Sequence, residues 1–499
     1  MAENAHNQPD FVCNARQKMA RQWTIVRDVA DGTLRLREVG AQYLPAEKAE
    51  KSEAYAIRLS RAILFNALDR TLHSLVGMVF RKPPTLNSDV PDVMRGRAAS
   101  DDVAGMEGLL EDADLAGNHW TVVAKELFTD AMRDGHAFLM VDAPPYPKRD
   151  DGQPATLQDL ERERWRPYLV RYRADQAINW RTDSKGRLLQ ITFEEKTWEA
   201  DGEFGEQEVC RYRVLRPGSW QVWRKIKDPK GETETLVLDT LPNGQPARGI
   251  TPLTEIPVAV VYSRRTGPLT SRPPLLDLAL VNIAHWQKYS DYSIGLHLTI
   301  PILGLKGGNA DQKVQAIGHY VVFRIPPDGD LKYVEPTGAG LEPQRTDLID
   351  LEDKMAVLGA AMLSKRTPTP KTATEELLSH VKEESDLATA ARSLQDCLEL
   401  ALSFFAKYLR LSSGGSVTLG ATVEELTLSP EKVRAFGELV TLRVVSKQTV
   451  REILGQANEL PDDFDEQREL QRLDREAADE EVRQQNLGAA ALAAFDRGQ

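Results

Sequence analysis

The chain has 499 residues, 41% of them hydrophobic and 28% charged, which is typical of a globular protein with several structural units. Its formal net charge of −12 excludes a protein that wraps nucleic acid by neutralising phosphates over its whole surface, because such proteins are usually basic. Three widely separated cysteines, Cys13, Cys210 and Cys397, argue against a disulfide framework or a zinc site and fit a reducing compartment.

Neither a signal peptide nor a membrane span is expected. The first residues lack the charged-then-apolar pattern of a secretory signal. No run of about 18 apolar residues is present, as a transmembrane helix would need. The most apolar stretch, 273–305, is interrupted by polar side chains at His285, Gln287, Lys288 and Asp291.

Helices are predicted for the first part of the chain. Residues 1–50 are charged and are expected to be partly helical, and the apolar spacing over 53–79 predicts one long helix. The following FRKPP sequence ends that helix, since proline cannot continue it. A further helical block is predicted within 101–141, with Gly135 as its C-cap and a strand over 137–141.

The middle of the chain changes character. Short alternating runs over 166–262 are separated by turn signals such as DSKG, RPGS, DPKG and LPNG, a pattern that predicts antiparallel β-structure. Three tryptophans occur in this region, Trp180, Trp220 and Trp223. We expect them to lie in the core or on a sheet face, and not to act as base-stacking platforms.

The rest of the chain is predicted to return to helix. Helices are expected over 274–298 and 342–363, separated by a compact αβ insert. A basic loop follows, and then a long helix for which Thr372 and Glu375 resemble a capping box. Beyond it, the sequence predicts a short strand within 415–428, a helix over 430–456 and a charge-laced helix over 465–485.

The sequence contains no recognisable catalytic or metal-binding motif. It has no Gly-Lys dipeptide, so a Walker A loop is excluded, and no GxSxG, HExxH or GxGxxG motif. The histidines never pair at metal-ligand spacing. We therefore expect no catalytic residue, no metal and no cofactor, and we interpret the chain as a non-enzyme.

The basic loop SKRTPTPKT (364–372) carries three cations, Lys365, Arg366 and Lys371, around Pro368 and Pro370. On residue type alone, an ordinary solvated loop is the simpler interpretation. The alternative is a loop that touches a polyanion, because phosphate contacts need only flexible cations. Three charges bind weakly alone but strongly when several copies face one axis.

Several segments together resemble the portal protein (head-to-tail connector) of tailed bacteriophages. LSRAILFNALDRTLHSLVGMVFRKPP (59–84) is similar to the N-terminal helix of one portal branch, and EIPVAVVYSRR with PLLDLALVNIAHWQKYSDY (255–292) resembles the strand that leads into the first stem helix. TATEELLSHVKEESDLATAARSLQDCLELALSFFAKYL (372–409) resembles the long wing helix after the tunnel loop. VVSKQTVREIL and LPDDFDEQRELQRLDRE (444–476) resemble the entry to the crown.

This resemblance spans roughly residues 53–480 and implies an α+β, mainly helical fold of portal-type architecture that assembles as a ring. The implied divisions are an N-terminal segment (1–52), a wing (53–273), a first stem helix (274–299), a clip (300–341), a second stem helix (342–363), a tunnel loop (364–373), a long wing helix (374–414), and a crown with the C-terminal tail (415–499).

The resemblance also implies a function and partners. The chain would form a ring, expected to be dodecameric, at one capsid vertex of the virion after assembly in the host cytoplasm. Double-stranded DNA would pass through the ring during packaging and ejection. The terminase large subunit would dock on the clip and later be replaced by head-tail adaptor or tail proteins, with the major capsid and scaffolding proteins as further partners and no membrane.

Site residues follow from the same resemblance. Lys365, Arg366 and Lys371 would be the DNA-contacting cations of the tunnel loop. Lys288 on the first stem helix is a further channel-lining candidate, with a subunit–subunit salt bridge as an equal alternative. A mainly negative ring repels the phosphate backbone and keeps DNA mobile, while a few cations supply transient contacts.

Two other functions stay open at the level of sequence. The chain could be another virion structural or scaffold protein that has no DNA channel. It could also be a hydrolase built on scattered carboxylates, although the sequence names no residue for that role.

Overall fold

The computed structural model describes most of the first 419 residues. The chain divides into two compact units, Met1–Gly420 and Ala421–Gln499, and Arg472 is the only described residue of the second. The described residues are 7–97, 105–144, 165–227, 234–241, 244–299, 302–306, 330–334, 338, 340–360, 385–419 and 472.

Four helices open the described part of the chain, namely α1 (Asn14–Ala30), α2 (Gly32–Val39), α3 (Ser52–Arg61) and α4 (Ala67–Val79). The prediction of a single helix over 53–79 is therefore wrong.

Tertiary hydrogen bonds explain the break between α3 and α4. The Arg37 guanidinium donates to the Ala62 carbonyl, at 3.0 and 3.1 Å, and the Leu64 amide donates to Thr33 Oγ1. Asn66 then caps α4 by accepting a hydrogen bond from the Asp69 amide. Such side-chain partners satisfy the backbone groups that a continuous helix would have paired internally.

A three-stranded antiparallel sheet, in the order β10-β2-β3, packs against helix α6 (Trp120–Asp134). As predicted, α6 (Trp120–Asp134) ends at Gly135, whose φ of +97° is left-handed, and β2 (His136–Asp142) follows directly. β3 (Tyr168–Arg173) and β10 (Val258–Tyr262) pair with β2 on either side, and almost every residue of β2 is buried.

A larger six-stranded antiparallel sheet confirms the β-rich interpretation of the middle region. Its core is shared with the first sheet, since Phe138 packs with Phe193 and Leu215, and Trp180 and Trp220 pack against this cluster as expected. The strands are β4 (Ala177–Thr182), β5 (Leu188–Asp201), β6 (Gly205–Arg216), β7 (Ser219–Lys227), β8 (Glu234–Leu238) and β9 (Arg248–Ile250), of which β9 pairs with β7.

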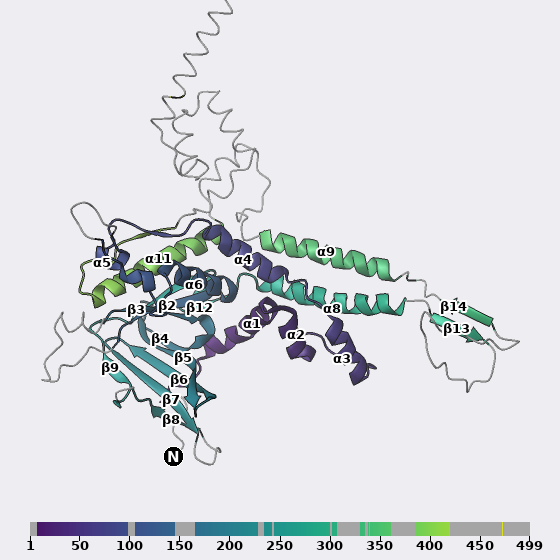
Figure 1. The fold of residues 1–499 in the computed structure, drawn as a ribbon, viewed down its shortest axis with the longest axis horizontal. Coiled ribbons are helices and arrows are strands. Elements are labelled where there is room, and N and C mark those ends of the chain that lie inside the picture. Colours follow the sequence, from purple (N-terminus) through teal and green to yellow (C-terminus); the bar gives the residue numbers. More distant parts are fainter. Residues whose placement is uncertain are drawn as a thin grey trace, which may run out of the picture. The chain divides into compact units, whose positions relative to one another are not determined.

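Beyond the sheets, α8 (Leu276–Leu298) and α9 (Leu341–Ala360) lie side by side (Figure 1). Between them in sequence, β13 (Ile302–Lys306) and β14 (Asp330–Val334) form an antiparallel pair. The remaining short elements are η2 (Gly40–Gln42), β1 (Thr85–Leu86), α5 (Asp92–Arg95), η3 (Leu109–Asp112), η4 (Ala174–Gln176), β11 (Arg265–Gly267), β12 (Thr270–Ser271) and β15 (Val417–Thr418).

The last described helix, α11 (Asp386–Tyr408), covers β2 and β10, and Ser393 Oγ accepts a hydrogen bond from the Tyr262 amide. Ser385 is extended and caps α11 by accepting from the Ala388 amide. The prediction of one uninterrupted helix from 374 to 410 is therefore wrong at Ser385. Residues 374–384, with most of the region predicted as a crown, lie outside the described residues.

These elements confirm a mixed helix-and-sheet fold for the described part of the chain. Among those residues, no helix is long and apolar enough to cross a membrane.

Candidate functional site: the α8–α9 helix pair

The first helix of the pair is fixed to the body of the protein by a buried amide. Asn282 has no exposed surface. Its Oδ1 accepts from the Leu68 amide at 3.2 Å, and its Nδ2 donates to the Phe65 carbonyl at 2.7 Å. Asn282 thus satisfies both a donor and an acceptor at the start of α4, which holds α8 in one rotational setting.

Three of the contacts between α8 and α9 show how the helices are aligned. Lys288 Nζ lies 2.5 Å from Asp347 Oδ2, and His285 Nε2 lies 3.3 Å from Glu352 Oε1. Farther along, the helices approach closely at Gly295, where an added Cβ would lie 2.7 Å from a Leu341 methyl carbon. These positions progress in opposite directions along the two helices, so the pair is antiparallel.

The His285 contact is a hydrogen bond more than an ion pair at neutral pH. Burial of the imidazole lowers the pKa of His285, although the neighbouring Glu352 carboxylate opposes the shift. His285 is only 3% exposed, and a neutral ring avoids the cost of desolvating a charge. The Lys288–Asp347 pair is half-exposed at both ends and contributes little net stability on its own.

The surface of the pair is mainly acidic. α9 is buried only along a narrow line of Leu348, Leu351 and Met355, so most of its circumference is open. Together α8 and α9 carry seven Asp or Glu side chains and three Lys or Arg side chains, an excess of four negative charges. Such a surface repels a phosphate backbone and does not hold it.

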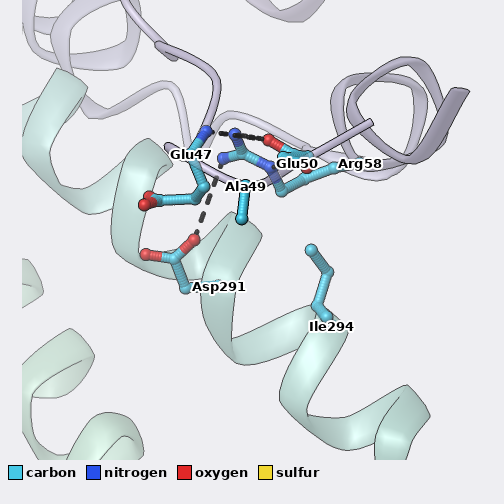
Figure 2. Close-up of a pocket in the computed structure, with 6 residues that line it drawn as sticks. All are labelled: Glu47, Ala49, Glu50, Arg58, Asp291 and Ile294. Atoms are coloured by element: carbon cyan, nitrogen blue, oxygen red, sulfur yellow. Dashed lines mark hydrogen bonds and ion pairs between the residues drawn. The ribbon is translucent and has the colours of Figure 1, made fainter. Parts of the chain in front are cut away.

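A pocket of about 500 Å³ lies where the segment before α3 meets α8 (Figure 2). The Arg58 guanidinium is buried there and donates to both carboxylate oxygens of Glu50, at 2.8 and 2.7 Å. Asp291 of α8 lies 3.9 Å away, and burial raises its pKa against the opposing charge of Arg58. Arg58 therefore links the N-terminal helices to the middle of α8.

The predicted site residues divide into two groups. Lys365, Arg366 and Lys371 lie outside the described residues, so their contact with DNA stays a prediction. Lys288 lies on α8 as predicted, and its partner in the structure is Asp347 of the same chain. Neither the predicted channel role nor the predicted subunit–subunit bridge is decided by this pair.

Asp347 was missed because a single sequence does not say which of several acids faces a given lysine. A signal does exist once the helices are paired. Lys288 comes seven residues before Gly295, and Asp347 comes six residues after Leu341. An antiparallel alignment anchored on the small residue would have brought the two side chains together. Within the described residues, no group of three or more His, Cys, Asp or Glu side chains could hold a metal ion.

Residues 274–409 match a family model described as a domain of unknown function (DUF4055). The match covers about a quarter of the chain, from just before α8 to just after α11. No curated protein matches the chain.

Three solved structures give partial matches, each at 14% identity. A chain in the neck of an empty GTA particle, computed with C6 symmetry, has a TM-score of 0.34 over 78% of this chain and 89% of that one. A chain in the virion of the native gene transfer agent (GTA) particle gives 0.36 over 84% and 98%. The neck of the native GTA particle, computed with C12 symmetry, gives 0.35 over 78% and 89%. TM-scores below 0.5 do not establish a common fold, so the residues of this chain must carry any functional inference.

Proposed function

We propose that this chain is a virion structural protein of the portal type, a subunit of a ring that conducts double-stranded DNA through a capsid vertex. The observation that carries the proposal is the antiparallel α8–α9 pair. Its exposed surface is acidic, its one Lys or Arg on α8 is paired within the chain, and the antiparallel β13–β14 pair lies between its helices in sequence. The basic loop sequence follows the end of α9.

The charge distribution suits a conduit. Tight binding along the channel would stop DNA, because each neutralised phosphate adds affinity. An acidic wall lowers that affinity, while Lys365, Arg366 and Lys371, repeated around the ring, supply transient contacts. A ring also explains the open face of α9, where Ile349 and Val357 are 46% and 69% exposed. A neighbouring subunit would cover these apolar side chains.

The proposal includes a division of labour. The ring itself is not an enzyme, and the terminase large subunit supplies ATP hydrolysis while docked on the clip. Head-tail adaptor or tail proteins then take its place, and the major capsid and scaffolding proteins surround the ring at the vertex.

The oligomeric state tests the ring directly. Mass photometry of the purified full chain should show one large species, expected to be a dodecamer, and class averages of negatively stained particles should show its rotational symmetry. A monomer that persists from nanomolar to micromolar concentration, with and without capsid and scaffolding proteins, would contradict a portal.

The loop is tested by reversing its charge. Changing Lys365, Arg366 and Lys371 to Glu should leave the ring intact and sharply reduce the DNA packaged per particle. The control reverses three exposed lysines elsewhere and should package normally; it combines Lys48→Glu, Lys125→Glu and Lys185→Glu. Normal packaging by the loop variant would favour a virion structural protein whose loop does not touch DNA.

The role of Lys288 is tested by exchanging the charges of its pair. The double variant Lys288→Glu with Asp347→Lys restores an ion pair of reversed polarity. If the lysine serves only the α8–α9 contact, assembly and packaging both recover relative to Lys288→Glu alone. If it contacts phosphates, assembly recovers while packaging stays reduced.

A further inference from the structure

The β5–β6 hairpin extends beyond the sheet that contains it. The ladder between β4 and β5 ends at Phe193, and the ladder between β6 and β7 begins at Arg211. Between these points β5 and β6 pair only with each other. Residues 194–210, here called the ribbon, thus have two outer edges without a neighbouring strand in the described part of the chain. Alternate backbone N–H and C=O groups along such edges are open to another strand.

Two large aromatic side chains project from the ribbon into solvent. Trp198 is 65% exposed and Phe204, in the turn, is 93% exposed. Trp198 lies directly opposite Glu208, and opposite residues share one face. Its neighbours on that face therefore include Glu206 toward the turn and Lys196 toward the base of the ribbon. Exposed aromatic side chains on a projecting element are typical of protein-binding surfaces.

The charge of the ribbon selects its partner. Beyond Lys196 it carries five carboxylates and no lysine, arginine or histidine. Glu199 is paired with Arg211. The other four acids, which are Asp201, Glu203, Glu206 and Glu208, have no ion-pair partner among the described residues and are exposed. A complementary ligand is therefore cationic, and nucleic acid is repelled.

The base of the ribbon is held in place before any partner binds. The Arg211 guanidinium donates to Thr197 Oγ1 and to Asp239 Oδ2, both at 2.6 Å, and also contacts Glu199. Asp239 directly follows β8 and is buried. Arg211 therefore links the base of the ribbon to the end of β8, the edge strand of the six-stranded sheet. This preorganisation lowers the entropy cost of binding.

We propose that the ribbon binds an extended, arginine- and lysine-rich segment of a partner protein. The segment adds as a strand to the open edge of β5 and places its cations against Trp198, Glu206 and Glu208. Strand addition supplies backbone hydrogen bonds, and a guanidinium stacks on an indole face while pairing with nearby carboxylates. A second ribbon is a poor occupant, because two acidic surfaces repel. The proposal does not depend on ring assembly.

The test uses fluorescence anisotropy of a labelled decapeptide of alternating Arg and Val, titrated with the full chain. Changing Trp198 and Phe204 to Ala should weaken binding about tenfold, from the loss of two exposed cation–π contacts. A second variant, with Glu203, Glu206 and Glu208 changed to Gln, should weaken it at least as much. High salt should reduce binding to the original chain, since exposed charges are screened.

Matched controls isolate each element of the proposal. Ile250→Ala removes another exposed apolar side chain, 89% exposed, and should bind the peptide normally. So should a chain that loses three exposed acids elsewhere, Asp31→Asn with Glu53→Gln and Glu107→Gln. A peptide of the same sequence with every backbone nitrogen methylated keeps the charges but lacks all backbone donors on both edges, and should bind at least tenfold more weakly.

Three results would overturn the proposal. Equal binding of the N-methylated peptide would exclude strand addition. Unchanged binding by both ribbon variants would exclude the ribbon as the site. Self-association that is lost in the Trp198 and Phe204 variant, without peptide binding to the original chain, would identify a second copy of the chain as the occupant.

Discussion

Arg27 connects three parts of the fold, and its partner Asp175 offers a quantitative test of that connection. From α1, the guanidinium donates to both carboxylate oxygens of Asp134, at 3.0 and 2.6 Å, and lies 2.5 Å from Asp175 beside β3. Asp134 is fully buried, and its carbonyl accepts from the Trp23 indole at 2.8 Å. We predict that Asp175→Asn destabilises the protein in a way that depends on pH.

The magnitude follows from the pKa of Asp175. Burial raises this pKa, but the hydrogen bond and the charge of Arg27 outweigh burial and lower it to about 2. Because the folded pKa is below the unfolded one, the paired carboxylate stabilises the fold above the unfolded pKa. That contribution is about 2 kcal/mol at pH 7 and falls to about half by pH 3. It disappears as the pH falls through the folded pKa.

The assay is urea-dependent hydrogen exchange of peptides from α1, measured at pH 7, 5 and 3 for the original chain and for Asp175→Asn. The free energy of unfolding of the variant should be lower than that of the original chain by about 2 kcal/mol at pH 7, and by about half as much at pH 3. Asp31→Asn, an exposed acid just after α1, should change stability by less than about 0.5 kcal/mol. A deficit that is the same at pH 7 and pH 3 would refute the reasoning.

Three further predictions concern thermal or chemical stability. Burial lowers the pKa of His136 to about 4, so the folded state binds this proton more weakly than the unfolded state. The free energy of unfolding should therefore fall by up to about 3 kcal/mol as the pH is lowered from 6.5 to 4. In urea titrations, His136→Asn should lack this decline. Asn282→Ala leaves the buried Leu68 amide without its partner and removes one of the two hydrogen bonds to the Phe65 carbonyl, which also accepts from the Ala67 amide. It should cost about 1–3 kcal/mol, seen as a lower melting temperature, whereas an unchanged melting temperature would contradict its role as the anchor of α8. Gly135→Ala combines a left-handed φ with a Cβ placed 2.4 Å from Ser271 Oγ and should cost at least about 2 kcal/mol; a matched Gly77→Ala change, with nothing within 4 Å, should be neutral or stabilising.

Much of the fold could be predicted because the signals were local. The apolar spacing before Gly135, the alternation over 166–262 and the apolar run after Pro274 each identified an element that the structure contains. The failures occurred where distant residues decide the outcome. A helix continuing from 53 to 79 is interrupted because Arg37 and Thr33 satisfy backbone groups at the break. The apolar spacing within residues 53–79 does not indicate these contacts with Thr33 and Arg37.

In the candidate site, too, local features could be predicted from the sequence and long-range contacts could not. Sequence alone placed Lys288 on a helix, but its partner lies 59 residues away among several acids on α9. The Ser385 cap could have been found locally, since serine is a strong N-cap residue. It was missed because the apolar spacing continues through this position and favours one longer helix. The Arg27 network joins residues 107 and 148 positions apart, and single-sequence patterns cannot identify such pairs.

The pairing of β1 with β15 has a consequence for the order of events in synthesis. Thr85 and Leu86 pair with Thr418 and Val417, and Ser416 Oγ donates to Asp89. The partner strand therefore emerges from the ribosome about 330 residues after β1, a delay of tens of seconds at typical elongation rates. The first unit cannot close until nearly all of it has been made. Any function that requires the closed first unit is thus confined to chains synthesised past Thr418, and shorter products lack it.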